Sequence, residues 1–261
     1  MNDFTSYYWT SNALPDESSI EAFQQLISEE SNNAQKIQAF LILLKNNNPV
    51  AQGIAFDYFF YFESLSRYGF NNLFSPYLYE LLVKAREQLN NPPIVSIAPN
   101  GTIVRGANHA SALGILAHLG EEEDIDLITN ILESSHDPYV VFACCLAAQR
   151  LLGLTKKNYP KIISSLTQII YEKQWSENVR IMSVRAFANY EIPEIEDILV
   201  SISRTQTLPI SAYAAVILGH LNFERYRNFL QELSANWTQD IQYPASEVLD
   251  MLEIDANQQH L

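Results

Sequence analysis

The sequence predicts an all-α fold, a superhelix of antiparallel helix pairs into which a small β-hairpin is inserted near residues 94–104. Three observations lead to this prediction. Apolar residues recur at helical spacing, helices rich in small residues return at intervals of 30 to 39 positions, and two short β-branched runs flank a turn.

Four segments carry apolar residues at positions i, i+3, i+4 or i+7, which share one face of a helix. Each segment is therefore expected to form an amphipathic helix with one buried side. The four segments are 127–132, 162–170, 195–202 and 226–233.

Helices of a second type, rich in small residues, lie between these segments. They begin at Ala110, Ala143, Met182, Ala212 and Ala245, so the steps between them are 33, 39, 30 and 33 residues. Small side chains let neighbouring helices approach closely. A two-helix repeat of this length is typical of an α-solenoid, in which stacking buries apolar faces that no single helix pair could bury.

Residues 105–255 resemble HEAT repeats. The resemblance rests on "DPYVVFACCLAAQRLLG" (137–153), "NVRIMSVRAFANY" (178–190) and "LPISAYAAVILGHL" (208–221), each with a turn residue or Pro near its start and a central alanine cluster. It covers a little more than half of the chain. It implies an architecture rather than an activity, because HEAT repeats mostly bind proteins and occasionally carry enzymes.

We expect a single domain over residues 1–261, with HEAT-like repeats over 107–261. Residues 1–90 are expected to form atypical helices, near 17–30, 34–46, 49–66 and 73–90, with many aromatic rings between positions 56 and 79.

Residues 91–106 are expected to hold the hairpin. The two β-branched runs, 94–97 and 102–104, flank a turn that ends in Asn100 and Gly101,. An insertion of this kind in a helical stack is a place where functional residues tend to occur.

Charge and composition narrow the function. The chain has 30 acidic and 16 basic residues, a formal net charge of -14. Such a chain is repelled by nucleic acids and by anionic membranes, whereas a basic protein partner is favoured. We expect no cofactor and no metal site, because only five histidines occur and the common metal-binding and phosphate-binding motifs are absent,.

The location expected for the protein is the cytoplasm. The N-terminus lacks a basic start followed by an apolar run, and no run of about 18 apolar residues occurs,. Cys144 and Cys145 are adjacent and poorly placed to bridge each other, which fits a reducing compartment,.

The stretch "TIVRGANHASALGIL" (102–116) brings Arg105, Asn108 and His109 together directly after the turn. The favoured interpretation is a helix entrance, in which Gly106 or Asn108 caps the helix, Arg105 pairs with a carboxylate and His109 is exposed. The alternative is a catalytic or binding site.

Asp57 is a further candidate, because nearly all its neighbours in "IAFDYFFYFES" are apolar. If this helix is buried, the carboxylate must be paired or protonated. Asp57 would then meet Arg105 or His109 in a catalytic cluster. The other interpretation places Asp57 on the solvent side of an amphipathic helix.

Two acidic runs occupy equivalent positions in the repeat, which predicts that they lie along one edge of the solenoid. They are expected either to stabilise the N-terminal ends of helices, where the helix dipole is positive, or to form a negative strip that attracts a basic partner. The candidate binding residues in them are Glu121, Glu122, Glu123, Asp124, Glu194, Glu196 and Asp197.

We therefore expect a non-catalytic protein that binds a partner through an acidic solenoid surface. One form of such a protein is a bacterial immunity protein that masks a basic toxin. The alternative is a HEAT-like enzyme, or a chaperone-like lyase, with a pocket near the hairpin. An enzyme should bring Asp57 and the three residues of the helix entrance within hydrogen-bond reach of one another, whereas a binding protein should leave them apart.

Overall fold

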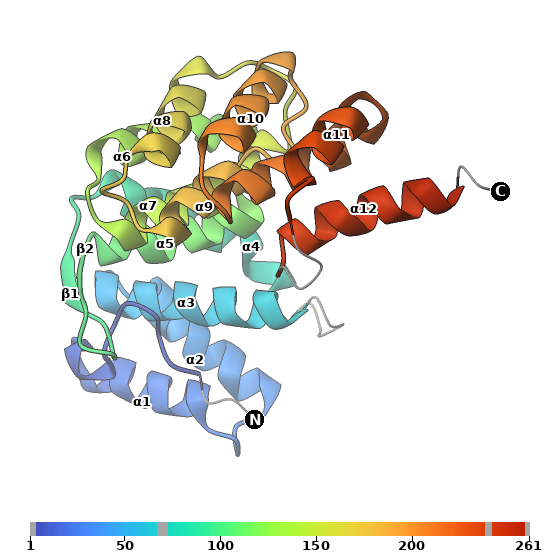
Figure 1. Ribbon diagram of the computed structural model, residues 1–261. Helices are drawn as coiled ribbons and strands as arrows, with labels where there is room; N and C mark the ends of the chain where they lie inside the picture. The colour runs from blue at the N-terminus through green and yellow to red at the C-terminus, as the bar shows by residue number, and fades with distance from the viewer. Residues whose placement is uncertain (1–3, 67–72, 238–241, 259–261) are drawn as a thin grey trace. The chain divides into compact units, whose positions relative to one another are not determined.

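The computed structural model describes residues 4–66, 73–237 and 242–258 (Figure 1). In these ranges the chain is about 70% helical, with twelve α-helices and one two-stranded antiparallel sheet. The prediction of an all-α fold with a small hairpin is confirmed. None of the helices in the described ranges is long and apolar enough to cross a membrane.

The chain divides into two compact units, Met1–Arg150 and Leu151–Leu261, and each is described by itself. The helices of the first unit are α1 (Glu17–Ile27), α2 (Asn33–Lys45), α3 (Pro49–Ser66), α4 (Leu78–Asn90), α5 (Ala107–Leu119), α6 (Ile125–Ser134) and α7 (Pro138–Leu152), whose last two residues belong to the second unit. The single domain remains a prediction.

The core of the first unit is built around α5. Helices α3 and α4 both pack against α5, α2 packs against α3, and α1 packs against α2. Every residue of α5 from Ala107 to Leu116 is buried. The small residues recognised in this helix permit the close approach, since a Cβ atom added to Gly114 would lie 3.2 Å from the Phe60 ring.

The aromatic segment is divided between core and surface. The rings of Phe56, Tyr58, Phe59 and Phe74 are buried, whereas Tyr79 is 80% exposed. Buried rings meet edge to face, for example Phe59 and Phe74 at 5.6 Å between centroids,. The remaining rings of the segment include Phe62, Tyr68 and Phe70, whose side chains lie outside the described part of the chain.

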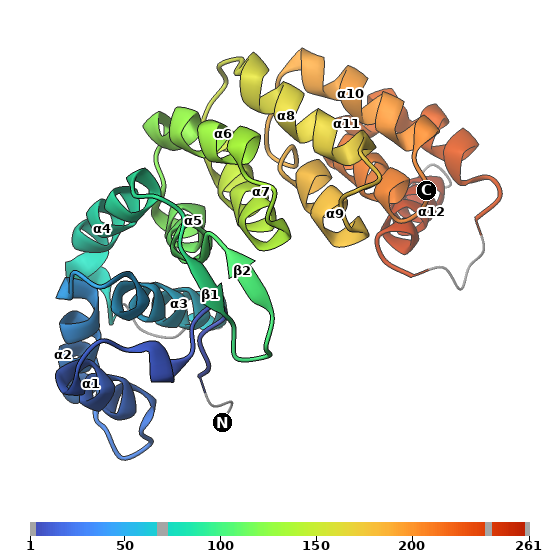
Figure 2. The same cartoon turned by 90° about the vertical axis from the view of Figure 1, so that its left-hand side faces the viewer.

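The hairpin consists of β1 (Val95–Ile97) and β2 (Ile103–Arg105) in an antiparallel pair, with Val95 opposite Arg105 and Ile97 opposite Ile103. Gly101 in the turn has φ +84, a left-handed conformation that favours glycine,. Figure 2 shows the hairpin beside α5, with its turn next to the N-terminal segment. The predicted position of the hairpin is confirmed.

The helices of the second unit are α8 (Pro160–Tyr171), α9 (Glu177–Arg185), α10 (Pro193–Thr205), α11 (Ile210–Ser234) and α12 (Ala245–Gln258). Helix α11 is interrupted at Asn222, whose φ of -162 and ψ of 83 are not helical. The Asn222 side chain accepts a hydrogen bond from the backbone of Arg225 (3.1 Å), as a residue that caps a new helix does,. The two arms of α11 correspond to the two helices expected there.

Both predicted helix types are therefore present in the second unit. The amphipathic stripes form α8, α10 and the second arm of α11. The small-residue helices form α9, the first arm of α11, and α12. Helix α8 packs against α9, and α11 contacts α9, α10 and α12. The HEAT resemblance and the superhelical arrangement remain predictions.

The substitution Gly53→Ala tests how the N-terminal segment packs on α3. A Cβ atom at Gly53 would lie 2.1 Å from Nε1 of the buried Trp9, whose indole N–H donates to Ser111 Oγ (2.9 Å). We expect the substitution to lower the free energy of unfolding by about 1–3 kcal/mol through overpacking, although Ala favours a helix.

The control is the same substitution in a Trp9→Ala background, where the space is empty. There Gly53→Ala should be neutral or stabilise by up to about 1 kcal/mol. Urea unfolding of the four proteins measures both effects, and equal effects in the two backgrounds would contradict the close packing of Trp9 on Gly53.

Candidate functional site

Asp57 lies in the interior of the first unit and is 2% exposed. Its Oδ2 atom accepts hydrogen bonds from Ser6 Oγ (2.6 Å) and from the backbone N–H groups of Tyr7 (2.9 Å) and Tyr8 (3.3 Å). The carboxylate therefore fastens the N-terminal segment to α3. Its position on the solvent side of a helix, one of the two interpretations of the sequence, is wrong because α3 is buried here.

Burial also changes the titration of Asp57. Loss of contact with water raises its pKa to about 6 and outweighs the opposing hydrogen bonds from Ser6, from Ser111 and from the backbone of Tyr7 and Tyr8,. A carboxyl with a raised pKa is often found at a functional site, but here its partners belong to the fold itself.

Asn108 and His109 hold the segment that leads into the hairpin. Asn108 Oδ1 accepts from the backbone N–H of Ile94 (2.8 Å), and Asn108 Nδ2 donates to the carbonyl of Pro92 (3.1 Å). His109 Nε2 donates to the carbonyl of Asn91 (2.8 Å). Both side chains thus bind backbone groups of residues 91–94, the segment between α4 and β1.

Two expectations for the helix entrance are corrected by this geometry. Gly106, one of the two residues expected to cap α5, is its N-cap, in a left-handed conformation (φ +101), whereas Asn108 does not cap the helix. His109 is buried rather than exposed, at 9%. The physical reason is shared: α5 is covered on all sides, so its polar residues must find partners inside the protein.

Arg105 is exposed at the end of β2, and its backbone N–H donates to Asp137 Oδ2 (2.6 Å). Its side chain makes no ion pair with any carboxylate in the described ranges, contrary to expectation. No hydrogen bond or ion pair joins any two of Asp57, Arg105, Asn108 and His109. The catalytic cluster considered from the sequence is therefore not formed by these described residues.

The first acidic run is held by a cation from α4. Arg86 binds Asp124 with two hydrogen bonds, through Nε (2.7 Å) and Nη2 (2.9 Å), and binds Glu121 through Nη2 (2.8 Å). Asp124 is 3% exposed, and Glu123 lies 3.4 Å from the same guanidinium. The carboxylates raise the pKa of Arg86, which keeps its charge.

The run 121–124, which also contains Glu122, is thus partly neutralised within the first unit. This geometry differs from a free negative strip. The sequence contains no local signal for Arg86, because it lies 35 to 38 positions before the carboxylates that it binds.

The second acidic run lies at the start of α10. Glu196 binds Arg225 and the Tyr226 hydroxyl. Burial and the neighbouring Glu196 raise the pKa of Tyr226 to about 12. Glu194 and Asp197 are exposed, and Glu194 has no ion-pair partner in the described part of the chain.

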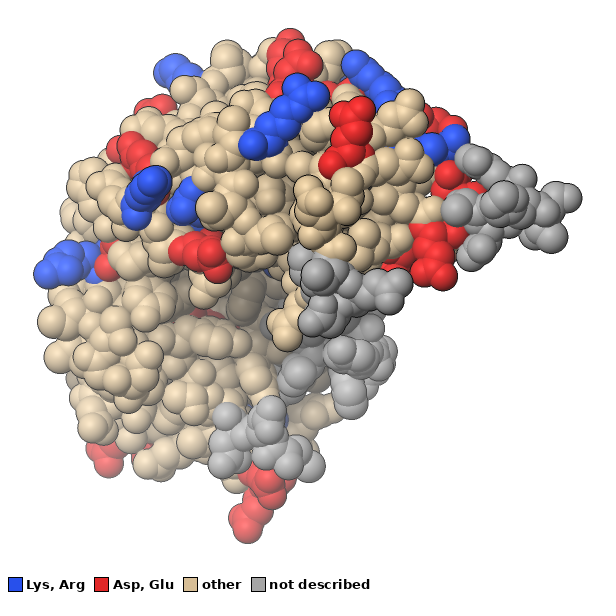
Figure 3. Space-filling model, viewed as in Figure 1, with Lys and Arg blue, Asp and Glu red and all other residues tan. Residues whose placement is uncertain are grey.

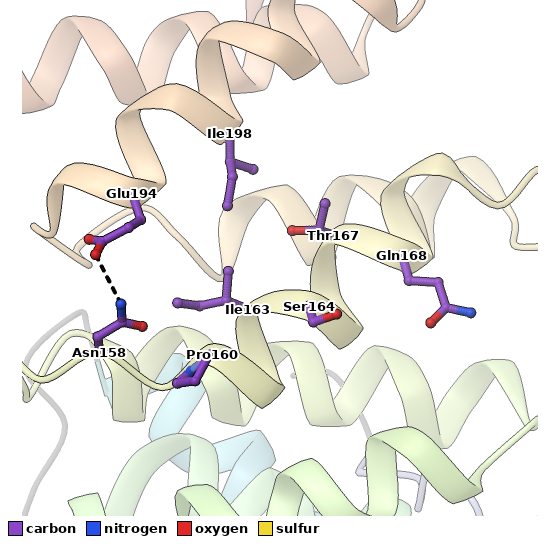
Figure 4. Close-up of a pocket in the computed structure, with 8 residues that line it drawn as sticks. All are labelled: Asn158, Pro160, Ile163, Ser164, Thr167, Gln168, Glu194 and Ile198. Atoms are coloured by element: carbon purple, nitrogen blue, oxygen red, sulfur yellow. Dashed lines mark hydrogen bonds between the residues drawn. The ribbon is translucent and has the colours of Figure 1, made fainter.

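A depression of about 490 Å³ lies between α8 and α10, within the second unit (Figure 4). Its apolar part includes Ile163 and Ile198, which point toward each other in the figure. Glu194 lies at one end, where its carboxylate accepts a hydrogen bond from Asn158 Nδ2 (3.0 Å), and Gln168 lies at the opposite end. We call this depression the α8–α10 groove; its lining residues are Asn158, Pro160, Ile163, Ser164, Thr167, Gln168, Glu194 and Ile198.

The α8–α10 groove suits contact better than catalysis. Glu194 is its one ionisable lining residue, so no acid–base pair is formed there,. Thr167 Oγ1 is buried without a hydrogen-bond partner. Only Glu194 among the lining residues was a candidate in the sequence, because no charge run or motif marks the neutral residues of α8.

A second pocket, of about 580 Å³, lies near the hairpin in the first unit. Pro99 from the hairpin turn lines it together with residues of the N-terminal segment and of α1, such as Thr5 and Phe23. The lining includes hydroxyl groups but no carboxylate, histidine, lysine or cysteine. One of these hydroxyl groups belongs to Ser6, which donates to Asp57 Oδ2 (2.6 Å), a carboxylate that does not itself line the pocket.

Metal and thiol chemistry gain no support from the described residues. They contain no group of three or more His, Cys, Asp or Glu side chains that could hold a metal ion. Cys144 and Cys145 are buried and form no disulfide, and burial raises the pKa of the Cys144 thiol, which keeps it protonated and unreactive,.

The raised pKa of Asp57 predicts a pH-dependent stability. The folded protein binds this proton more tightly than the unfolded chain, so the stabilising contribution is complete below about pH 4 and is lost as pH rises through about 6,. Asp57→Asn keeps an acceptor oxygen and removes the titration. Between about pH 4 and about pH 7.5, wild type should lose about 3 kcal/mol of unfolding free energy relative to the Asn variant.

Urea unfolding at both pH values measures this difference, and a parallel pH dependence of the two proteins would refute it. Asp16→Asn, at an exposed helix N-terminus where hydrogen bonds lower the pKa, is the control. Because a lowered pKa places its titration mainly below about pH 4, it should change the stability difference between these two pH values little, and in the opposite direction.

Comparison with known proteins adds no relative. No protein-family model matches the chain, and searches of curated proteins and of solved structures found no match either.

Proposed function

We propose that this chain is a non-catalytic, HEAT-like protein-binding repeat protein, and that the α8–α10 groove receives a basic segment of its partner. The observation that carries the proposal is the composition of this groove. It joins an apolar surface, to which exposed Pro160 and half-buried Ile198 contribute, to Glu194, a carboxylate with no ion-pair partner in the described ranges. The net charge of -14 supports a basic partner, because it steers cations toward the protein,.

Glu194 is favoured over the first acidic run for a physical reason. Glu121 and Asp124 are already bound by Arg86, so a partner would have to displace that cation or add to a shared charge. Figure 3 shows Lys and Arg among Asp and Glu on one face, rather than a continuous acidic area. The surface therefore fits a local site, with a carboxylate that only the neutral Asn158 binds, better than a uniform negative strip.

The enzyme and lyase alternative has less support. Asp57, Asn108 and His109 each bind groups that the fold must satisfy, and the pocket near the hairpin contains no acid–base side chain. An immunity protein that masks a basic toxin is one form of the proposed function, supported by the net charge. We also propose a cytoplasmic location, supported by the two cysteines, which form no disulfide,.

The test is affinity capture from native lysate, at low salt (about 0.01 M) and at high salt (about 1 M), where the Debye length falls from about 30 Å to about 3 Å. We expect a stoichiometric basic partner that is retained at low salt and released at high salt. Its binding should then be measured with purified components. Glu194→Lys should weaken it by about tenfold or more, because it reverses the charge at the groove.

The matched control is Glu232→Lys, which changes the net charge equally at an exposed position of α11 outside the groove. Equal weakening by the two variants would show that net charge alone drives binding and would refute the groove. Absence of a partner at both salt concentrations would count against the function as a whole.

A further inference from the structure

One face of the hairpin exposes three β-branched apolar residues. Val95 is 63% exposed, Ile97 58% and Ile103 53%. The opposite face supplies the residues that pack inward, among them Val104, which is 0% exposed, and Ala98. Strands that cover a core normally place polar residues on the outer face, so this ribbon is apolar on both sides.

The register shows which backbone groups point away from the ribbon. Ala98 N–H donates to the Thr102 carbonyl and Gly106 N–H to the Ile94 carbonyl (2.8 and 2.9 Å). In an antiparallel ladder, hydrogen-bonded and non-hydrogen-bonded pairs alternate. The pairs Val95–Arg105 and Ile97–Ile103 are consequently of the second kind, and their N–H and C=O groups point to the outer edges.

The two outer edges are not equivalent. At the β2 edge, Asp137 already accepts from the Arg105 N–H (2.6 Å). At the β1 edge, the outward groups of Val95 and Ile97 have no hydrogen-bond partner in the described ranges. An edge with unpaired N–H and C=O groups and apolar neighbours is a template for another strand.

Arg105 adds a charge to the same exposed face. It lies opposite Val95, and its guanidinium makes no ion pair with a described carboxylate. A third strand on β1 would lie about 10 Å from β2, twice the distance between neighbouring strands. A long side chain on that strand, beside Val95, is within reach of the Arg105 side chain.

We propose that the β1 edge binds an extended segment of a partner protein as a third strand, with apolar side chains over Val95 and Ile97 and a carboxylate paired with Arg105. Main-chain hydrogen bonds to Val95 and Ile97 supply affinity, and the apolar face and Arg105 supply specificity. This site goes beyond the proposed function, since it lies in the other unit and takes a segment of the opposite charge.

A second copy of this chain fits the edge less well. A stable protein–protein interface buries about 1,200 Å² or more in total, whereas the exposed face here is formed by three apolar residues and one arginine,. Two chains that each carry a net charge of -14 also repel each other,. A short strand from another protein needs neither so large an interface nor the symmetric contact of two identical chains.

The test uses the full chain and two dye-labelled peptides of about nine residues, a typical strand length. Each alternates Val and Thr and carries one Glu, at the N-terminal end in one peptide and at the C-terminal end in the other, so that both strand directions are covered. We expect saturable binding of at least one peptide, measured by fluorescence anisotropy. Failure of both peptides to bind would overturn the proposal.

Two proline variants locate the binding edge. Ile97→Pro removes an outward N–H of β1, and Ile103→Pro removes the outward N–H of its cross-strand neighbour on β2; neither N–H takes part in the β1–β2 ladder,. Ile97→Pro should weaken binding by about tenfold or more, and Ile103→Pro by about threefold or less. Equal losses would overturn the assignment to β1. Circular dichroism of both variants confirms that the helices are intact.

Arg105→Gln tests the charge. This substitution should weaken binding of the Glu-containing peptide by about fivefold. It should leave unchanged the binding of the same peptide with Gln in place of Glu. An equal effect on both peptides would contradict the pairing with Arg105. Concentration-dependent dimerisation of the chain alone, abolished by Ile97→Pro, would assign the edge to a second copy and overturn the proposed partner.

Discussion

The burial of α5 on every side is the constraint from which the arrangement of the first unit follows. A helix with no solvent face cannot leave a polar side chain unsatisfied without a cost of about 1–3 kcal/mol for each group. Asn108, His109 and Ser111 all lie within the buried stretch of α5. Asn108 and His109 therefore bind the backbone before β1, and Ser111 accepts from Trp9. The polar cluster that resembles an active site is explained by these requirements.

The same constraint explains how much of the fold and of the candidate site could be predicted from the sequence. Local periodicity sufficed for the helices, including the kinked α11, and for the hairpin, because these depend on residues close in the sequence. The burial of Asp57 and His109 depends on segments that pack from elsewhere. Asp57 is bound by residues about 50 positions earlier, which no pattern around position 57 reveals. Asn108 does not cap α5, because Gly106, a glycine with positive φ, occupies the N-cap position.

The net charge of -14 does not by itself show which carboxylates could bind a partner. The sequence predicts that the two acidic runs are equivalent in a repeat, but their cations come from different helices, Arg86 from α4 and Arg225 from α11. Arg86 binds three carboxylates of the first run, whereas Arg225 binds Glu196 in the second run and Glu194 has no ion-pair partner among the described residues. A negative total charge steers a partner toward the protein, whereas the free carboxylates determine where it binds. Glu194 satisfies this local requirement, because its neighbour Asn158 is neutral.

The hairpin is the part of the first unit that the packing of α5 does not explain. Its inner face is needed to cover the core, but Val95, Ile97 and Ile103 on the outer face gain nothing from the fold while they remain exposed,. Polar residues would serve the hairpin equally well if folding were their only role. Asp137 closes the β2 edge, and no corresponding group in the described part of the chain closes the β1 edge. A binding role for β1 accounts for both the apolar outer face and the one-sided protection of the ribbon.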